Sequence, residues 1–267
     1  DISFSPENVL SLDQLAKEKN VTAVVDAGVA PGIPNFLLGY WNSKMKINSF
    51  DYCVGGLPKN PSPPYNYKAP FSPIDVIEEY TRPARMRINS QVVTKPALSD
   101  LEIFNFSEVG KLEAFNTDGL RSLLQTMSHI PNMKEKTLRY PGHAKLIQSM
   151  IDDGLFNDKN FDKTINKLFK DWKLKEDEPE FTILDINIYS DTNNIHYHLY
   201  DETDDISKSS SMARTTGFTA TATINMLLNN LWSKKGVFPP ELVGENEQCI
   251  DFLLSYLSAR NVTMSQN

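Results

Sequence analysis

Hydrophobic and polar residues recur along the chain with periods that predict short strands and helices in mixed order. The opening stretch predicts a strand over 2–4, a helix over 13–19 with Ser11 as its N-cap, and a β-branched strand over 21–25. Such a β-α-β unit is too small to bury both faces of its own sheet. We therefore expect further sequence to precede Asp1.

The rest of the chain predicts alternating elements that are separated by glycine and proline. Apolar residues at helical spacing predict helices over 33–41, 73–80, 144–153, 161–172, 209–231 and 249–257, and a further one after Gly119. Runs of alternating or β-branched residues predict strands over 47–54, 101–106, 111–115, 181–189 and 195–200, and a polar strand or hairpin over 85–94. We expect Gly55-Gly56 to end the first of these strands and residues 260–267 to fray.

Composition narrows the class of protein. The 267 residues are 40% hydrophobic, enough for a sizeable core, and the formal net charge of −7 argues against a nucleic-acid-binding surface. Cys53 and Cys249 lie far apart and match neither a disulfide framework nor a zinc pattern, so a reducing compartment such as the cytoplasm is expected. No apolar run approaches the ~20 residues of a membrane span, so we expect no membrane partner.

The stretch over 136–143 predicts a strand that ends in Arg139, a sharp turn at Pro141-Gly142, and a helix that begins near His143. This arrangement holds Arg139 and His143 at the rim of a strand-turn-helix unit, where functional sites often form. The alternative interpretation is that Arg139 pairs with a surface acid and that His143 merely begins a helix.

Two glycine-containing segments follow predicted strands. Asp26 ends one strand and leads into a Gly/Pro loop over 27–32, the kind of strand end at which α/β sheets bind ligands. Gly55 and Gly56 would let a backbone approach a ligand closely, and the alternative is an ordinary turn. The chain contains no GxGxxG nucleotide fingerprint.

Two features of the last third of the chain are candidates for function: Arg214 and a pair of histidines. Arg214 near the start of the helix over 209–231 opposes the helix dipole, so we expect an anion or an acid to hold it. His196 and His198 share one strand face, but no third metal ligand is evident; we interpret them as exposed or hydrogen-bonded and predict no metal site. One apolar stripe is expected along this helix: Ala213, Ala220, Ile224, Leu227, Leu228 and Leu231.

Five stretches, taken in order, carry a family resemblance: residues 28–32, 53–58, 113–119, 137–143 and 212–218. Together they resemble the saccharopine dehydrogenase family, including its lysine 6-dehydrogenase-like branch, over nearly the whole chain. Saccharopine-forming members tend to have an acid where this chain has Ala30. That departure, with the proline-rich loop over 58–64, favours the lysine 6-dehydrogenase-like branch.

The resemblance implies an α/β (α+β) fold in three parts. Residues 1–35 would be the C-terminal remnant of a Rossmann dinucleotide-binding domain. Residues 36–205 would form a substrate-binding and dimerisation domain, a mixed and mostly antiparallel sheet with helices on one face. Residues 206–267 would pack back toward the Rossmann part. Because most of the dinucleotide site would then lie in preceding sequence, we expect residues 1–267 alone to be inactive.

The resemblance also implies the chemistry: hydride transfer between an amine-bearing carbon of lysine or a lysine-derived amino acid and NAD or NADP, in a homodimer. Arginine suits a substrate carboxylate because its guanidinium pairs with it in bidentate fashion. The residues expected to bind substrate are Arg139, Cys53, Gly55, Gly56 and Arg214. Those expected near the cofactor are Val29, Ala30, Pro31 and Ser72. Asp26 and His143 are the candidates for proton transfer.

A second hypothesis remains open. The chain would be a non-catalytic dimerisation or ligand-binding module that kept the fold, with Arg139 paired internally to Asp or Glu. The enzyme hypothesis instead predicts that Arg139, Cys53, Gly55 and Gly56 converge on one cleft that faces the loop over 29–32.

Overall fold

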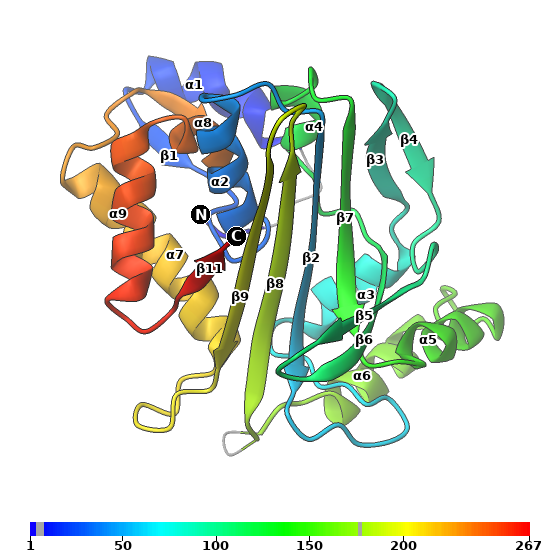
Figure 1. Ribbon diagram of the computed structural model, residues 1–267. Coiled ribbons are helices and arrows are strands. Elements are labelled where there is room, and N and C mark those ends of the chain that lie inside the picture. The colour runs from blue at the N-terminus through cyan, green and yellow to red at the C-terminus, as the bar shows by residue number, and fades with distance from the viewer. Residues whose placement is uncertain (4–7, 176–177) are drawn as a thin grey trace.

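The secondary structure follows the predicted succession closely. The computed structural model describes residues 1–3, 8–175 and 178–267 (Figure 1). The helices are η1 (Val9–Leu12, 3₁₀), α1 (Asp13–Glu18), α2 (Ile33–Asn42), α3 (Pro73–Thr81), α4 (Leu123–Thr126), α5 (His143–Asp152), α6 (Phe161–Asp171), α7 (Ser211–Leu228), α8 (Pro240–Gly244) and α9 (Glu247–Ser258). The strands are β1 (Thr22–Val24), β2 (Ser49–Pro58), β3 (Ala84–Ile88), β4 (Gln91–Lys95), β5 (Glu102–Phe106), β6 (Gly110–Asn116), β7 (Asn132–Arg139), β8 (Glu180–Tyr189), β9 (Asn194–Glu202), β10 (Gly236–Phe238) and β11 (Met264–Gln266).

A large mixed sheet organises the molecule. Its strand order is β11-β9-β8-β2-β7-β3-β4, and β6 adds to β7 and carries β5. The β2–β7 pair is parallel, whereas the other neighbouring pairs of this sheet are antiparallel. The prediction of a mixed, mostly antiparallel sheet is therefore confirmed.

Helices pack on both faces of this sheet, not on one face as predicted. The reason is visible in β8, which is apolar in both registers. Leu184, Ile186 and Ile188 point into a core that also holds residues of α2, α7 and α9, whereas Phe181 and Ile183 join a core with α3, α5 and α6. The first helix group lies to the left of the sheet in Figure 1, and the second lies at its lower right.

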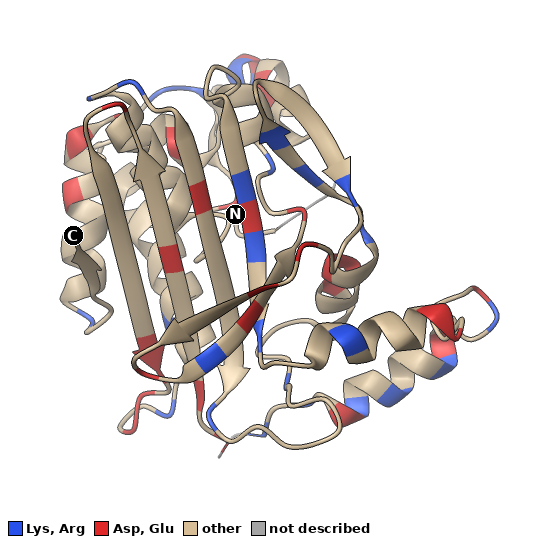
Figure 2. Cartoon of the chain, turned by 45° about the vertical axis from the view of Figure 1, so that its right-hand side comes forward, with Lys and Arg blue, Asp and Glu red and all other residues tan. Residues whose placement is uncertain are grey.

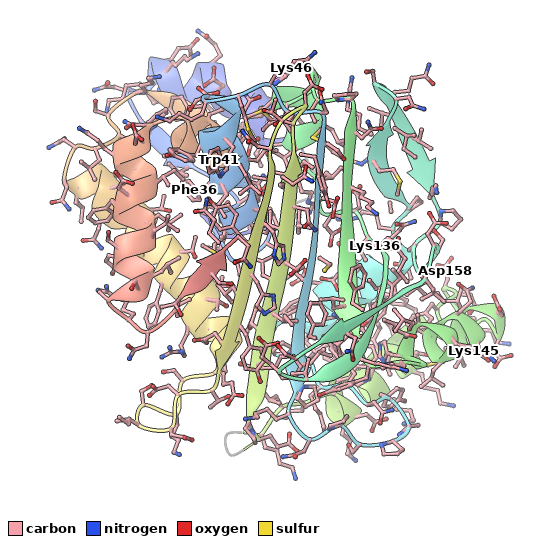
Figure 3. All side chains as sticks on the ribbon, in the orientation of Figure 1. Phe36, Trp41, Lys46, Lys136, Lys145 and Asp158 are labelled. Atoms are coloured by element: carbon pink, nitrogen blue, oxygen red, sulfur yellow. The ribbon has the colours of Figure 1, made fainter. Side chains whose placement is uncertain are left out.

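Side-chain contacts tie α2 to the sheet within the first of these cores. Phe36 is fully buried there. Trp41 (Figure 3) donates a hydrogen bond from Nε1 to the hydroxyl of Tyr197 on β9 at 2.9 Å. The helix that follows the loop over 27–32 is thus fixed against the sheet, and it fixes the loop in turn.

The opening segment differs from the predicted β-α-β unit. Ile2 and Ser3 do not form a strand, and Phe4, the last position of the predicted strand over 2–4, lies outside the described residues. Strand β1 instead pairs in parallel with β10, with Val24 opposite Phe238. Two segments far apart in the sequence therefore lie side by side, because β1 takes its partner from residues 236–238.

Two further predictions are wrong. Strand β2 continues through Gly55 and Gly56, because each glycine faces a neighbour and not a turn: a Cβ on Gly55 would lie 2.9 Å from Leu138 Cβ, and one on Gly56 would lie 2.5 Å from the Met212 methyl group. The C-terminal residues do not fray, because β11 adds an edge strand to β9, with Met264 opposite Leu199.

Helix α7 buries a different face from the predicted apolar stripe. Ile224 is 53% exposed and Leu228 is 71% exposed. The buried face includes three threonines whose hydroxyl groups each donate to the carbonyl oxygen four residues earlier, so that burial leaves no polar group unsatisfied. The buried residues of this helix are Ser211, Arg214, Thr215, Thr219, Ala222, Thr223 and Met226.

Candidate active site

A cavity of about 640 Å³ opens where seven segments of the chain meet, a volume typical of small-molecule sites. These segments are residues 2–3, the loop over 28–31, residues 70–71, strands β2 and β7, and helices α3 and α7. The lining residues are Ile2, Ser3, Gly28, Val29, Ala30, Pro31, Val54, Gly55, Gly56, Pro70, Phe71, Asp75, Glu78, Glu79, Thr137, Arg139, Met212, Ala213, Thr216 and Gly217.

Arg139 ends β7 and lines this cavity, but it is 2% exposed and does not sit at an open rim. Its Nη2 forms an ion pair with Glu79 Oε2 at 3.0 Å and lies 3.5 Å from the Tyr67 hydroxyl. Nε donates to the Tyr80 hydroxyl at 2.8 Å, and Nη1 donates to the Leu138 carbonyl at 2.9 Å. Four of the five guanidinium N–H groups are thereby used by described residues, which leaves one on Nη1.

Helix α3 contributes three acidic residues to the cavity lining. Asp75, Glu78 and Glu79 occupy positions i, i+3 and i+4 of α3, which places their side chains on one helix face. Glu78 forms an ion pair with Arg82 one turn later. Burial raises the pKa of Glu79, against the opposing attraction of Arg139. The cavity therefore offers both a guanidinium and carboxylates, the two groups that recognise the opposite charges of an amino acid.

His143 lies behind Arg139 and outside the cavity lining, so the rim position predicted for it is wrong. Its Nδ1 bonds the Tyr65 carbonyl at 2.8 Å and must donate, because a carbonyl only accepts. Nε2 then accepts from the Tyr80 hydroxyl at 3.0 Å, and this hydroxyl accepts from Arg139. Burial, together with the nearby Arg139 charge, lowers the pKa of His143 to about 3. A neutral His143 therefore orients Tyr80 and, through it, Arg139.

The predicted site residues divide into two groups. Gly55, Gly56, Val29, Ala30 and Pro31 line the same cavity as Arg139.

Four other predicted residues do not line this cavity. Cys53 is buried in the core under α3, α5 and α6, where burial raises the pKa of its thiol, and Ser72 is exposed at the start of α3. Asp26 is buried beside the loop, and desolvation raises its pKa to about 6. Arg214 forms ion pairs with Asp201 at 3.0 Å and Asp204 at 3.5 Å, which confirms the prediction that acids hold it.

Sequence reasoning missed Glu79, Glu135 and Thr137. The helix predicted after Gly119 begins only at Leu123, and Thr117, which precedes it, donates a hydrogen bond to Glu135. One available signal was the acid spacing on α3, and another was an acid in the middle of an otherwise buried strand.

Among the described residues, no group of three or more His, Cys, Asp or Glu side chains is arranged to hold a metal ion. His196 and His198 both bond Asp185 Oδ1, at 2.7 and 3.1 Å, so the predicted hydrogen-bonded role is confirmed. No helix within 1–3, 8–175 and 178–267 has the length and apolar character that a membrane crossing requires.

Comparison with known proteins identifies the family. Residues 28–262 match the family described as "Saccharopine dehydrogenase C-terminal domain". The chain belongs to this family. The resemblance found in the sequence is thereby confirmed. The match begins at Gly28, so it includes the cavity loop, both glycines of β2, Arg139 and helix α7.

Two further comparisons agree with the family assignment. The chain is 26% identical over 168 residues to alpha-aminoadipic semialdehyde synthase, mitochondrial, of Rattus norvegicus and equally to that of Bos taurus. Each match covers 58% of this chain and 18% of the relative, so the chain spans less than a fifth of those proteins. The apo, histidine-tagged saccharopine dehydrogenase (L-Glu forming) from Saccharomyces cerevisiae shares the fold, with a TM-score of 0.74 at 15% identity over 99% of this chain and 78% of that one.

Proposed function

We propose that the cavity binds the substrate of an NAD(P)-dependent dehydrogenase that acts on the CH–NH bond of lysine or a lysine-derived amino acid. One observation carries the proposal: Arg139, with an N–H to spare, shares a cavity with the loop over 29–31 and with the carboxylates of α3. A substrate carboxylate would accept a hydrogen bond from Nη1, and a substrate ammonium would be attracted to the carboxylates of α3. Family membership supports the same class of enzyme.

The residues of this chain fit one end of the cofactor. Val29, Ala30, Pro31 and Met212 give the cavity an apolar wall suited to a flat ring such as nicotinamide. In the described ranges, Arg139 is the one cation that lines the cavity, and it faces Glu79, so these residues do not fit a pyrophosphate. Nicotinamide, when bound, would accept the hydride from the amine-bearing carbon. Arg139 would hold that carbon in place by its carboxylate, and the apolar wall would exclude water.

The test uses the full-length protein that contains this chain. L-lysine and saccharopine are supplied as substrates with NAD or NADP, and reduced nicotinamide is followed by its absorbance. We expect turnover with one of the two substrates and a loss of at least about 100-fold in kcat/KM in Arg139→Met. Thr182→Val is the matched control, because Thr182 is fully buried and lies outside the cavity lining. Unchanged kcat/KM in Arg139→Met would refute the assignment.

The internal pair between Arg139 and Glu79 favours a second candidate, a ligand-binding module without catalysis. Calorimetric titration of the full-length protein with each amino acid separates the two candidates. Binding that Arg139→Met abolishes, without turnover in the presence of either cofactor, would support the module. The homodimer stays a prediction, and sedimentation velocity tests it.

A further inference from the structure

A buried carboxyl group lies beside the cavity and takes no part in the substrate contacts described above. Glu135 on β7 is 4% exposed, and its Oε2 accepts hydrogen bonds from Thr117 Oγ1 at 2.7 Å and from the Gly119 amide at 3.0 Å. A Cβ on Gly119 would lie 2.6 Å from the Glu135 carboxyl carbon. The backbone there has room for this carboxyl group because residue 119 is a glycine.

Two hydroxyl groups connect this carboxyl group to the cavity. Thr117 Oγ1 lies 2.8 Å from Thr137 Oγ1, and Thr137 lines the cavity beside Arg139. Glu135, Thr137 and Arg139 occupy alternate positions of β7, which direct side chains to one face of a strand. Figure 2 shows the acidic band between two basic bands along this strand, and Lys136, labelled in Figure 3, is the basic residue that follows Glu135.

A second, smaller cavity of about 30 Å³ adjoins this chain of groups, a space comparable to that of one water molecule. Glu135 and Thr137 line it, and it shares Ala30, Val54, Glu78, Glu79 and Thr137 with the main cavity. These hydrogen-bonded groups therefore lead from the carboxyl group of Glu135, which the substrate cannot reach, to the hydroxyl group of Thr137, which the substrate can touch.

We propose that Glu135 stores and returns the proton of the reaction, exchanging it with the main cavity through the hydroxyl groups of Thr117 and Thr137. This inference rests on the proposed function, because it assigns the route of the proton that accompanies amine oxidation. Thr137 is the group that meets the substrate or its attacking water. Thr117 and Glu135 act through it.

The transfer balances without any further reactant. Thr117 donates to the Glu135 carboxylate, so Thr137 donates to Thr117 and its lone pair faces the cavity. A proton from the substrate nitrogen or from water binds Thr137 Oγ1, the Thr137 proton moves to Thr117, and the Thr117 proton moves to Glu135. One proton moves in total, no electrons are transferred, and reversing all three hydrogen bonds returns it.

The electrostatic surroundings suit a group that both takes and gives a proton. Burial, opposed by the Thr117 hydrogen bond and supported by the charge of Glu79, raises the pKa of Glu135 to about 8. A pKa near the working pH is the condition under which a group serves as both acid and base. The other charged or titratable groups around the small cavity are Glu78 and Arg82 of α3, Asp118 after β6 and Tyr52 of β2.

The pH profile of kcat in the full-length protein tests the proposal. In the oxidative direction the carboxylate accepts the proton, so we expect kcat to rise as the pH increases through about 8. Glu135→Gln keeps the size of the side chain but cannot take the proton. It should lower kcat by about 100-fold and remove this ionisation, with KM changed less than about threefold.

Matched threonine variants separate proton transfer from packing. Thr137→Val removes the hydroxyl group and should lower kcat by at least about tenfold, whereas Thr137→Ser keeps the hydroxyl group and should recover most of that loss. Thr182→Val serves as the control for the loss of a buried hydroxyl group that has no partner among the described residues. Equal activity in Thr137→Val and Thr137→Ser, or a retained ionisation in Glu135→Gln, would overturn the relay.

Infrared titration of the ligand-free protein distinguishes failure of the relay from failure of the proposed function. We expect a protonated carboxyl band that disappears with a pKa near 8, is absent in Glu135→Gln and titrates at a different pH in Thr137→Val. Absence of turnover with lysine and saccharopine in the wild type contradicts the proposed function alone. A band that Thr137→Val leaves unchanged contradicts the relay whether or not the protein turns over substrate.

Discussion

Arg139 and Arg214 are both buried and ion-paired, yet their surroundings differ. Arg214 near the start of α7 is held by Asp201 and Asp204, and its Nη2 also donates to the Arg260 carbonyl at 3.1 Å. Arg139 at the end of β7 has one carboxylate partner, Glu79, and its remaining side-chain partners are the neutral hydroxyl groups of two tyrosines.

The difference separates an arginine that stabilises the fold from one that can bind a ligand. Two carboxylates neutralise Arg214, and Arg214 does not line the main cavity. Tyrosine hydroxyl groups orient the Arg139 guanidinium without cancelling its charge, and Arg139 lines the cavity. Ion pairing alone therefore does not exclude a binding role. What matters is the number of acids and the space next to the guanidinium.

Replacement of Arg139 gives the largest expected effect. Arg139→Met leaves Glu79 buried without its partner, which should cost about 3–5 kcal/mol of unfolding free energy in urea titrations and abolish substrate binding in calorimetry. The double variant Arg139→Met with Glu79→Leu removes both charges. It should recover most of the stability but none of the binding. Recovery of binding in the double variant would contradict the assigned role of Arg139.

Replacement of Arg214 tests whether this arginine stabilises the fold without binding the substrate. Arg214→Leu leaves Asp201 and Asp204 near one another without a cation, so we expect a loss of about 3 kcal/mol in unfolding free energy. Substrate affinity of the folded protein should stay within about twofold of the wild type, because Arg214 does not line the cavity. Equal losses of affinity in the Arg139 and Arg214 variants would show that the two arginines serve one site.

Local sequence predicted the elements that carry both arginines. A proline-glycine turn after a strand predicted the end of β7 at Arg139, and the helix dipole predicted an acid beside Arg214. These predictions succeed because their physical causes lie within a few residues of the position concerned.

Partners distant in sequence account for the predictions that failed. Gly55 and Gly56 were expected to end a strand, but Leu138 and Met212 occupy the space next to them. The acid opposite Arg139 comes from α3, 60 residues earlier, and local spacing does not reveal which acid it is. His143 was expected at the rim of the site, but tertiary packing buries it. Contact across the fold, and not residue type, sets these roles.

The pH dependence of stability tests whether a neutral His143 supports Arg139. The pKa of His143 is lowered to about 3 in the folded protein from an ordinary value near 6.5, so the unfolded chain binds the proton first as the pH falls. The contribution of neutral His143 to the free energy of unfolding is fully present above pH ~6.5 and is lost progressively as the pH falls toward ~3. Between pH ~6.5 and ~5 the loss amounts to about 2 kcal/mol, at about 1.4 kcal/mol per pH unit.

Urea titrations of His143→Gln between pH 5 and pH 7 measure this term, because Gln preserves one donor and one acceptor without the ionisation. The difference in unfolding free energy between wild type and variant should shrink as the pH falls. His129→Gln is the control for the replacement of an exposed histidine. Parallel curves for wild type and His143→Gln would show that His143 does not stay neutral behind Arg139.

The smallest expected effect concerns Gly217, which lies on α7 one turn after Arg214 and lines the cavity that Arg214 does not reach. A Cβ there would meet nothing within 4 Å, so Gly217→Ala should raise the unfolding free energy by about 0.5–1 kcal/mol through helix propensity. Gly56→Ala is the matched control, because its Cβ would meet Met212 and Pro70 and should destabilise the fold. If the substrate packs against α7, the added methyl group at residue 217 lowers its affinity while thermal stability rises. Unchanged affinity would show that the substrate contacts the Arg139 side of the cavity and not α7. Helix α7 would then contribute to stability only, as Arg214 does.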